Sequence, residues 1–136
     1  MPEWPVSWSG MNMILAVAAG GALGSVARYL VMSQAGLWLG LAFPWGTLAV
    51  NVVGSFVMGA LVETFALVWS AGAETRAFLT VGVLGGFTTF SAFSLDVVTL
   101  IERGEAALVA GYVAASVVVS VVALIAGLRL FRLVLA

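Results

Sequence analysis

The chain has 136 residues, of which 63% are hydrophobic and 8% charged, and its formal net charge is −1. Soluble domains carry about 25% charged residues, so this composition excludes a water-exposed surface. The sequence contains no Cys, His or Lys, which excludes thiol and imidazole catalysis, Schiff-base chemistry and the usual zinc ligands. Because there is also no basic run, we expect neither an enzyme nor a nucleic-acid-binding protein.

Long charge-free stretches separate the few charged residues. They cover residues 4–27, 29–62, 77–95 and 106–128. A helix that crosses a bilayer needs about 20 mainly apolar residues, and the first run is too long for a signal peptide. The sequence therefore predicts an all-α integral membrane protein with one transmembrane domain over residues 1–136. Its four spans are expected at about residues 11–33, 44–69, 78–101 and 106–129.

The first predicted span follows Trp4 and Trp8, which stand where aromatic residues favour a membrane interface. Within the span, Gly20 and Gly24 recur one helical turn apart. Small residues at this spacing let helix backbones approach closely, so we interpret this face as a packing surface. The segment 34–46 contains Gly, Pro and two Trp residues, and we expect it to be a short turn that ends at an interface.

The arginines give little preference for one orientation in the membrane. With four spans, Arg76, Arg129 and Arg132 share one side, whereas Arg28 and Arg103 belong to the other. An excess of basic residues on one side normally fixes the topology of a membrane protein. Because that excess is nearly absent, the chain is expected to insert in both orientations and to form an antiparallel homodimer with an in-plane two-fold axis.

Two predicted spans each carry three hydrogen-bonding side chains at a spacing of four residues. They are Thr47, Asn51 and Ser55 in the second span and Tyr112, Ser116 and Ser120 in the fourth. This spacing places each set on one helical face. Uncharged donors in a span must face protein or water. Two interpretations remain open: hydrogen bonds between helices, or a line of donors for an anion that crosses the membrane.

The third predicted span contains a cluster of small and β-branched residues near its middle. The cluster consists of Gly85, Gly86, Thr88, Thr89 and Ser91. Because such residues hold a continuous helix poorly, we expect the helix to break there, near the bilayer midplane. Backbone carbonyls freed by a break can bind a hard cation in a transporter. A kink that binds no ion is the alternative.

The side chains around this cluster are ambiguous. Phe90 and Phe93 share a helical face and either pack against lipid and protein or offer their positive ring edges to an anion. Asp96 and Glu63 lie within spans but away from the centres, so each is either hydrated or functional. Arg28 either extends to a lipid headgroup or attracts anions at a vestibule.

Three motifs together resemble the microbial Fluc fluoride channels, also called the CrcB family. The motifs are GGALGSVARYL at residues 20–30, GTLAVNVVGSFVMG at 46–59 and GGFTTFSAFS at 85–94. The resemblance extends in order from Gly20 to Ser120. It implies a dual-topology antiparallel dimer with two fluoride pathways and a structural Na⁺ at the dimer axis.

The resemblance also implies roles for individual residues. The backbone carbonyls of Gly85 and Thr88 from both subunits would hold the Na⁺. Residues assigned to the fluoride pathway by this likeness, or by their place in the stripes and the cluster, are Asn51, Phe90, Phe93, Thr47, Ser91, Tyr112, Ser116, Ser120 and Arg28. Two positions depart from the family pattern: Ala92 replaces an expected threonine, and Asp96 replaces a frequent glutamate.

The sequence is thus expected to encode a passive channel in the cell inner (plasma) membrane that exports cytoplasmic fluoride. One alternative is a proton-coupled exporter similar to the small multidrug resistance proteins. Those proteins use a glutamate in the first span, whereas residues 4–27 contain no acid. The other alternative is a non-conducting scaffold subunit, in which the polar stripes are only helix contacts.

Overall fold

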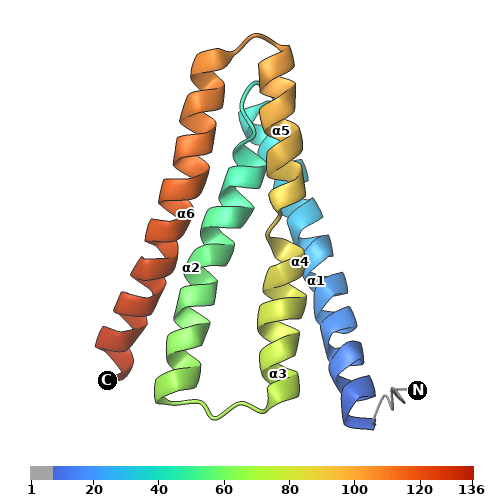
Figure 1. Ribbon diagram of the computed structural model, residues 1–136, viewed down its shortest axis with the longest axis vertical. Helices are drawn as coiled ribbons and strands as arrows, with labels where there is room; N and C mark the ends of the chain where they lie inside the picture. Colours follow the sequence, from blue (N-terminus) through green and yellow to red (C-terminus); the bar gives the residue numbers. More distant parts are fainter. Residues whose placement is uncertain (1–7) are drawn as a thin grey trace, which may run out of the picture.

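The computed structural model describes residues 8–136, and these residues are entirely helical apart from short connections (Figure 1). Three long helices are α1 (Trp8–Leu39), α2 (Trp45–Leu67) and α6 (Ala106–Leu135). The remaining segment consists of α3 (Ala73–Ala77), the π-helical η1 (Phe78–Leu84), α4 (Gly85–Phe87) and α5 (Phe90–Glu102). The predicted interfacial Trp4 lies outside the described residues.

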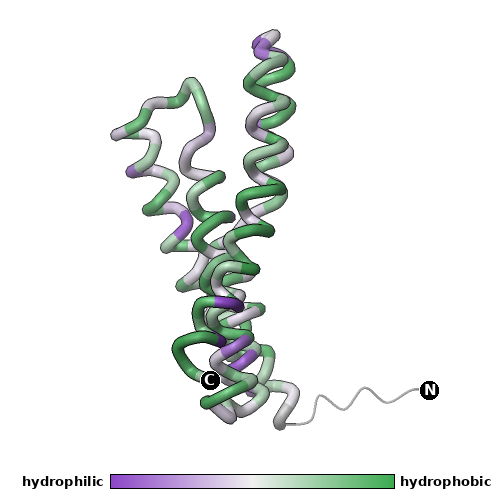
Figure 2. Tube along the Cα trace, turned by 90° about the vertical axis from the view of Figure 1, so that its left-hand side faces the viewer, coloured by the Kyte–Doolittle hydropathy of each residue, from purple (hydrophilic) through white to green (hydrophobic). Residues whose placement is uncertain are grey.

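Four helical segments are long and apolar enough to cross a membrane, which confirms the predicted all-helical fold with four candidate spans. They are Gly10–Leu39, Trp45–Leu67, Ala73–Glu102 and Ala106–Leu135. The start of α1, the α2–α3 connection and the C-terminus lie at one end of the molecule (Figure 1). The α1–α2 connection and the α5–α6 turn lie at the other end. Figure 2 shows that apolar residues cover most of each helix.

Glycines allow the helices to pack in two close pairs. α2 packs along α6, and α1 packs against η1 and α4. A side chain at Gly24 would collide with the backbone carbonyl of Val83, so the predicted packing face on α1 contacts the third helical segment. Gly127 of α6 meets the carbonyl of Phe56 in the same way. These contacts join the two halves of the chain without large side chains between them.

The turn predicted at residues 34–46 is wrong for its first six residues, because α1 continues to Leu39. Within this last part of the helix, Nε1 of Trp38 donates a hydrogen bond of 3.0 Å to Oε1 of Gln34, one turn earlier. The helix ends where Gly40 adopts a φ of 79°, which is a left-handed conformation that favours glycine. Polar residues and glycine in this segment therefore mark the last turn of the helix and its end.

The fourth span also extends beyond its predicted end at residue 129, since α6 continues to Leu135. Arg132 lies in this extension and forms a two-contact ion pair with Glu63 of α2, with Nε to Oε1 at 2.7 Å and Nη2 to Oε2 at 3.1 Å. The Glu63 side chain is almost fully buried. The ion pair thus accounts for Glu63 as a helix-to-helix contact.

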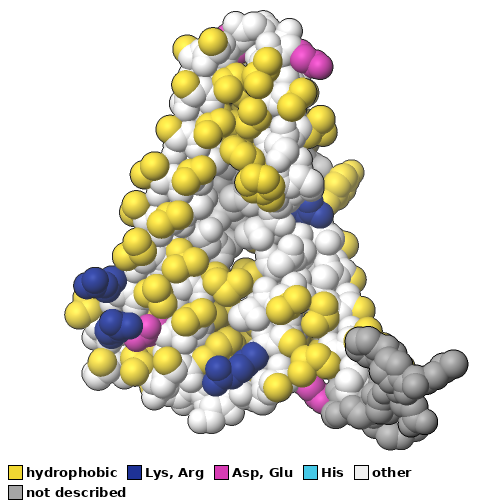
Figure 3. All heavy atoms as spheres, viewed as in Figure 1, with side chains coloured by type: hydrophobic (Ala, Val, Ile, Leu, Met, Phe, Trp, Pro, Cys, Tyr) yellow, Lys and Arg dark blue, Asp and Glu magenta, His cyan; other side chains and the backbone are white. Residues whose placement is uncertain are grey.

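Little of the chain is buried when it stands alone. The largest fully buried side chains are Tyr112, Val50 and Thr47, all near the contact between α2 and α6. Many large apolar side chains are exposed, and Figure 3 shows hydrophobic groups over most of one face, with a hollow at its centre. A surface of this kind requires lipid or another protein subunit to cover it.

Candidate functional site

The backbone leaves helical geometry at only two residues of the third segment. Thr88 has φ −84° and ψ 159°, and Thr89 has φ −154° and ψ 122°, which are extended conformations. α4 ends at Phe87 and α5 begins at Phe90. Both extended residues are β-branched threonines, which suit this conformation.

Asn51 of α2 binds the extended residues with both ends of its side-chain amide. Its Nδ2 donates to the carbonyl oxygen of Thr89 at 3.0 Å, and the Thr89 amide donates to Oδ1 at 2.8 Å. Thr89 then caps α5, because its Oγ1 accepts a hydrogen bond of 3.1 Å from the amide of Ala92. The side chain of Asn51 therefore satisfies both backbone polar groups of Thr89, as a neighbouring strand would do in a β-sheet.

These side-chain contacts divert two amides away from backbone carbonyls. In a continuous helix, the amide of Thr89 would donate to the carbonyl of Gly85, and that of Ala92 to the carbonyl of Thr88. Here the first donates to Asn51 and the second to the side chain of Thr89. The carbonyls of Gly85 and Thr88 consequently lack their helical partners.

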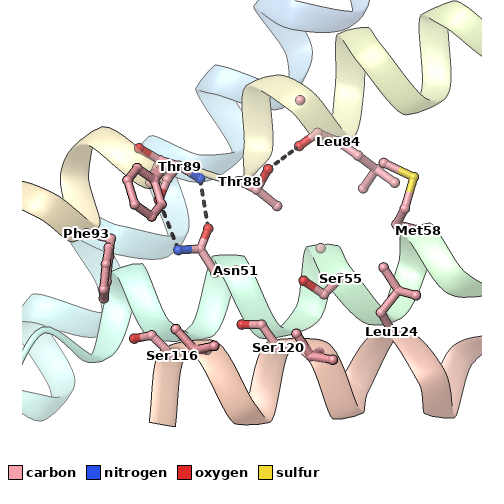
Figure 4. Close-up of a pocket in the computed structure, with 15 residues that line it drawn as sticks. Asn51, Ser55, Met58, Leu84, Thr88, Thr89, Phe93, Ser116, Ser120 and Leu124 are labelled. Atoms are coloured by element: carbon pink, nitrogen blue, oxygen red, sulfur yellow. Dashed lines mark hydrogen bonds between the residues drawn. The ribbon is translucent and has the colours of Figure 1, made fainter. Parts of the chain in front are cut away.

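A pocket of about 430 Å³ lies beside the extended residues, between α2, α6 and the third segment (Figure 4). Its lining includes five residues predicted for the anion pathway, namely Asn51, Phe90, Phe93, Ser116 and Ser120. It also includes Gly85 and Thr88. In Figure 4, Asn51, Phe93 and Ser116 lie towards one end, whereas Met58 and Leu124 lie towards the other. Asn51 and Ser116 therefore make one end of the pocket partly polar, and the other end is apolar.

Two hydroxyl groups on α6 have no close hydrogen-bond partner among the described residues, although Ser116 is near enough to interact with the Tyr112 hydroxyl. They are Oγ of Ser116 and Oγ of Ser120, and both are buried from solvent. They lie across from Asn51 and Ser55 of α2 in Figure 4. Because buried polar groups normally have partners, two unpaired hydroxyls at this place indicate room for a hydrogen-bonding ligand.

Three aromatic rings connect the pocket with Tyr112, the remaining residue of the polar set on α6. The ring centroids of Phe90 and Phe93 are 5.3 Å apart, and those of Phe93 and Tyr112 are 5.2 Å apart. Tyr112 is fully buried, and its hydroxyl donates a hydrogen bond of 2.9 Å to Oδ2 of Asp96. The sequence did not reveal this contact, which gives Asp96 a partner inside the protein.

The remaining predicted site residues lie outside the pocket lining. Thr47 is 2% exposed. Ser91 is exposed, with its hydroxyl 3.2 Å from that of Thr89. Arg28 lines a separate hollow on α1 with Ser25 and Tyr29, so the structure of one chain does not bring it to the pocket.

The described residues contain no cluster of three or more acidic side chains that could hold a metal ion. The donors near the pocket are instead uncharged groups: an amide, hydroxyls, and the two backbone carbonyls without helical partners. Uncharged groups of this kind can replace water molecules in the hydration shell of a small ion. Because they carry no full charge, they do not hold the ion too tightly for release.

Four apolar helical segments, three of which line a partly polar pocket, define a small multi-pass membrane protein. A family profile described as "CrcB-like protein, Camphor Resistance (CrcB)" matches residues 15–128. The chain belongs to this CrcB family.

Several relatives cover almost the whole chain. The "Fluoride-specific ion channel FluC" of Rhodospirillum centenum is 62% identical over 90% of this chain and 97% of the relative. Proteins of the same name from Nitrobacter winogradskyi and Agrobacterium fabrum are 60% and 58% identical, each over 90% of this chain and 98% of the relative.

Proposed function

We propose that the protein is a fluoride-selective ion channel, and not an enzyme, that lets cytoplasmic fluoride leave the cell passively. The main support is the pocket, where the unpaired hydroxyls of Ser116 and Ser120 lie opposite the amide of Asn51. The names of the relatives support fluoride as the ion. Uncharged donors suit an anion that must lose water and still be released, since permeation requires moderate binding at several positions.

Each group in the pathway has a distinct task in this proposal. One hydrogen of Asn51 Nδ2 binds the Thr89 carbonyl, which leaves the second hydrogen for fluoride. Ser116 and Ser120 donate their hydroxyl hydrogens in turn. Phe90 and Phe93 offer ring edges at one side of the pocket.

The outer parts of the pathway involve other predicted residues. Tyr112 donates its hydroxyl hydrogen to Asp96, so it would border the pathway and could only accept a hydrogen bond there. Thr47 and Ser91 extend the polar track, and Arg28 attracts anions to the vestibule.

The proposal includes a structural Na⁺ bound where two subunits meet. The carbonyls of Gly85 and Thr88 lack helical partners, and freed backbone carbonyl oxygens suit a hard cation such as Na⁺. These residues therefore fit the ion, and two subunits would each contribute both carbonyls. The bound ion would supply a fixed positive charge that holds the two interrupted helices together near the bilayer midplane.

An antiparallel homodimer in the inner (plasma) membrane completes the proposal. Exposed Phe90 and exposed Gly85 support it, because both border the pocket and are uncovered in the single chain. The native chain has no Cys, so the single substitution Ser70→Cys in the α2–α3 connection reports the orientation directly. Labelling of intact cells should reach about half of the molecules from outside. Complete labelling or complete protection would contradict dual topology.

Fluoride efflux from proteoliposomes tests the function itself. Vesicles loaded with fluoride, with valinomycin added to dissipate the voltage, should lose fluoride rapidly when no proton gradient is imposed. Vesicles loaded with chloride should retain it. Efflux that requires a proton gradient would favour an exporter, and no efflux from correctly folded protein would favour a scaffold.

A further inference from the structure

We infer that Asn51 is the positioning residue for the cation site, in addition to its role in the anion pathway. Its carboxamide keeps the Thr89 amide away from the Gly85 carbonyl and thereby leaves this carbonyl free for a cation. The inference rests on the cation site proposed above. It extends that proposal by making the occupancy of the cation site depend on a side chain of a different helix.

The backbone of Thr89 is held in place by the side chain of Asn51. Asn51 contacts both backbone polar groups of Thr89, at 2.8 Å and 3.0 Å, and so fixes the peptide in an extended conformation. Without this partner, the amide of Thr89 would be buried and unsatisfied, which is costly in a membrane protein. Its nearest helical acceptor is the carbonyl of Gly85. Loss of Asn51 therefore favours a hydrogen bond from the Thr89 amide to the Gly85 carbonyl, which is one of the proposed cation ligands.

The second carbonyl depends on the same arrangement. The amide of Ala92 donates to Oγ1 of Thr89, which leaves the carbonyl of Thr88 without its helical partner. This contact requires the extended Thr89 that Asn51 holds in place. Thr99 of α5 offers a matched control, because its hydroxyl donates to the carbonyl of Leu95 at 2.9 Å and takes no part in the proposed cation site.

The test measures the melting temperature of the purified full chain in Na⁺ and in N-methyl-D-glucamine, which is too large for the site. The wild type and Thr99→Val are expected to melt higher in Na⁺. Asn51→Leu and Thr89→Val are expected to lose this difference, or to need at least tenfold more Na⁺ for the same shift. Thr89→Ser retains the Oγ acceptor and should restore it.

Each outcome decides the inference. A normal Na⁺ shift in Asn51→Leu would overturn it, even if fluoride efflux is lost, because Asn51 would then serve the anion alone. If Asn51→Leu does not fold, Asn51→Ala takes its place, and a Na⁺ shift equal to that of Thr99→Val would overturn the inference. Equal Na⁺ shifts in Thr89→Val and Thr99→Val would overturn the part that concerns the Thr88 carbonyl. A wild type that conducts fluoride but melts equally in both cations would overturn it while the channel function stands. The expected pattern of shifts without fluoride efflux would support it while the channel function fails.

Discussion

The unpaired hydroxyls of α6 give the sharpest prediction about permeation. Ser116→Ala and Ser120→Ala each remove one buried oxygen that has no partner among the described residues. A serine that only joins helices would destabilise the protein when it is removed. A serine that serves a passing ion would leave stability intact and lower the rate of permeation.

The expected magnitudes follow from the state of these hydroxyls. An unsatisfied buried polar group costs about 1–3 kcal/mol, so its removal should leave the free energy of unfolding unchanged or slightly higher. A hydrogen bond to a charged group is worth about 1.5–3 kcal/mol. If removal of the hydroxyl raises the highest free-energy barrier by about half of this amount, fluoride efflux should fall by roughly four- to tenfold for each serine, since about 1.4 kcal/mol corresponds to a factor of ten.

The assay combines fluoride efflux from proteoliposomes with the melting temperature of the same preparations. Ser94→Ala is the matched control, because the Ser94 hydroxyl is exposed and already donates to the Phe90 carbonyl at 2.9 Å. The control should conduct like the wild type. The reasoning is refuted if Ser116→Ala and Ser120→Ala conduct normally but melt at clearly lower temperatures than Ser94→Ala.

Three further predictions concern the rings and the helix contacts. Phe90→Ile and Phe93→Ile should both lower fluoride efflux while the dimer stays assembled, and Phe93→Ile should also lower the melting temperature, because its ring contacts the buried Tyr112; unchanged efflux in both would count against the ring edges. Gly127→Val forces a side chain against a backbone carbonyl of α2 and should cost about 1–3 kcal/mol or prevent folding, and a normal denaturation midpoint would contradict the close packing of α2 and α6. Glu63→Gln should lower the melting temperature, and a double-mutant cycle with Arg132→Gln should give a coupling between the two; simple additivity would mean that the ion pair contributes nothing.

The four candidate spans were predictable because bilayer thickness sets the length of an apolar run, whatever the details of packing. Their ends were less predictable. Gln34 and Trp38 look like turn residues in the sequence, but their hydrogen bond lies within the last turns of α1. Arg132 extends α6 because its partner Glu63 is on another helix, and no local pattern contains that information.

The polar stripes were predictable in position but not in their partners. The spacing of four residues predicts that each set shares one helical face, and in the structure Asn51, Ser116 and Ser120 line one pocket. It does not reveal that the Asn51 amide is paired with Thr89, 38 positions away, or that Tyr112 is satisfied by Asp96. Those contacts depend on how helices that are distant in the sequence cross, and no local pattern contains that information.

The lengths of the outer helices have a consequence for the membrane around the protein. At 1.5 Å per residue, the 32 residues of α1 span about 48 Å and the 30 residues of α6 about 45 Å, whereas the hydrocarbon core of a bilayer is about 30 Å thick. Both helices run obliquely in Figure 1, so the molecule widens towards one end. Tilt is a common response to such hydrophobic mismatch. Lipids with longer acyl chains should therefore favour more upright helices and narrow this splay, which makes acyl-chain length a variable that acts directly on the shape of the bundle.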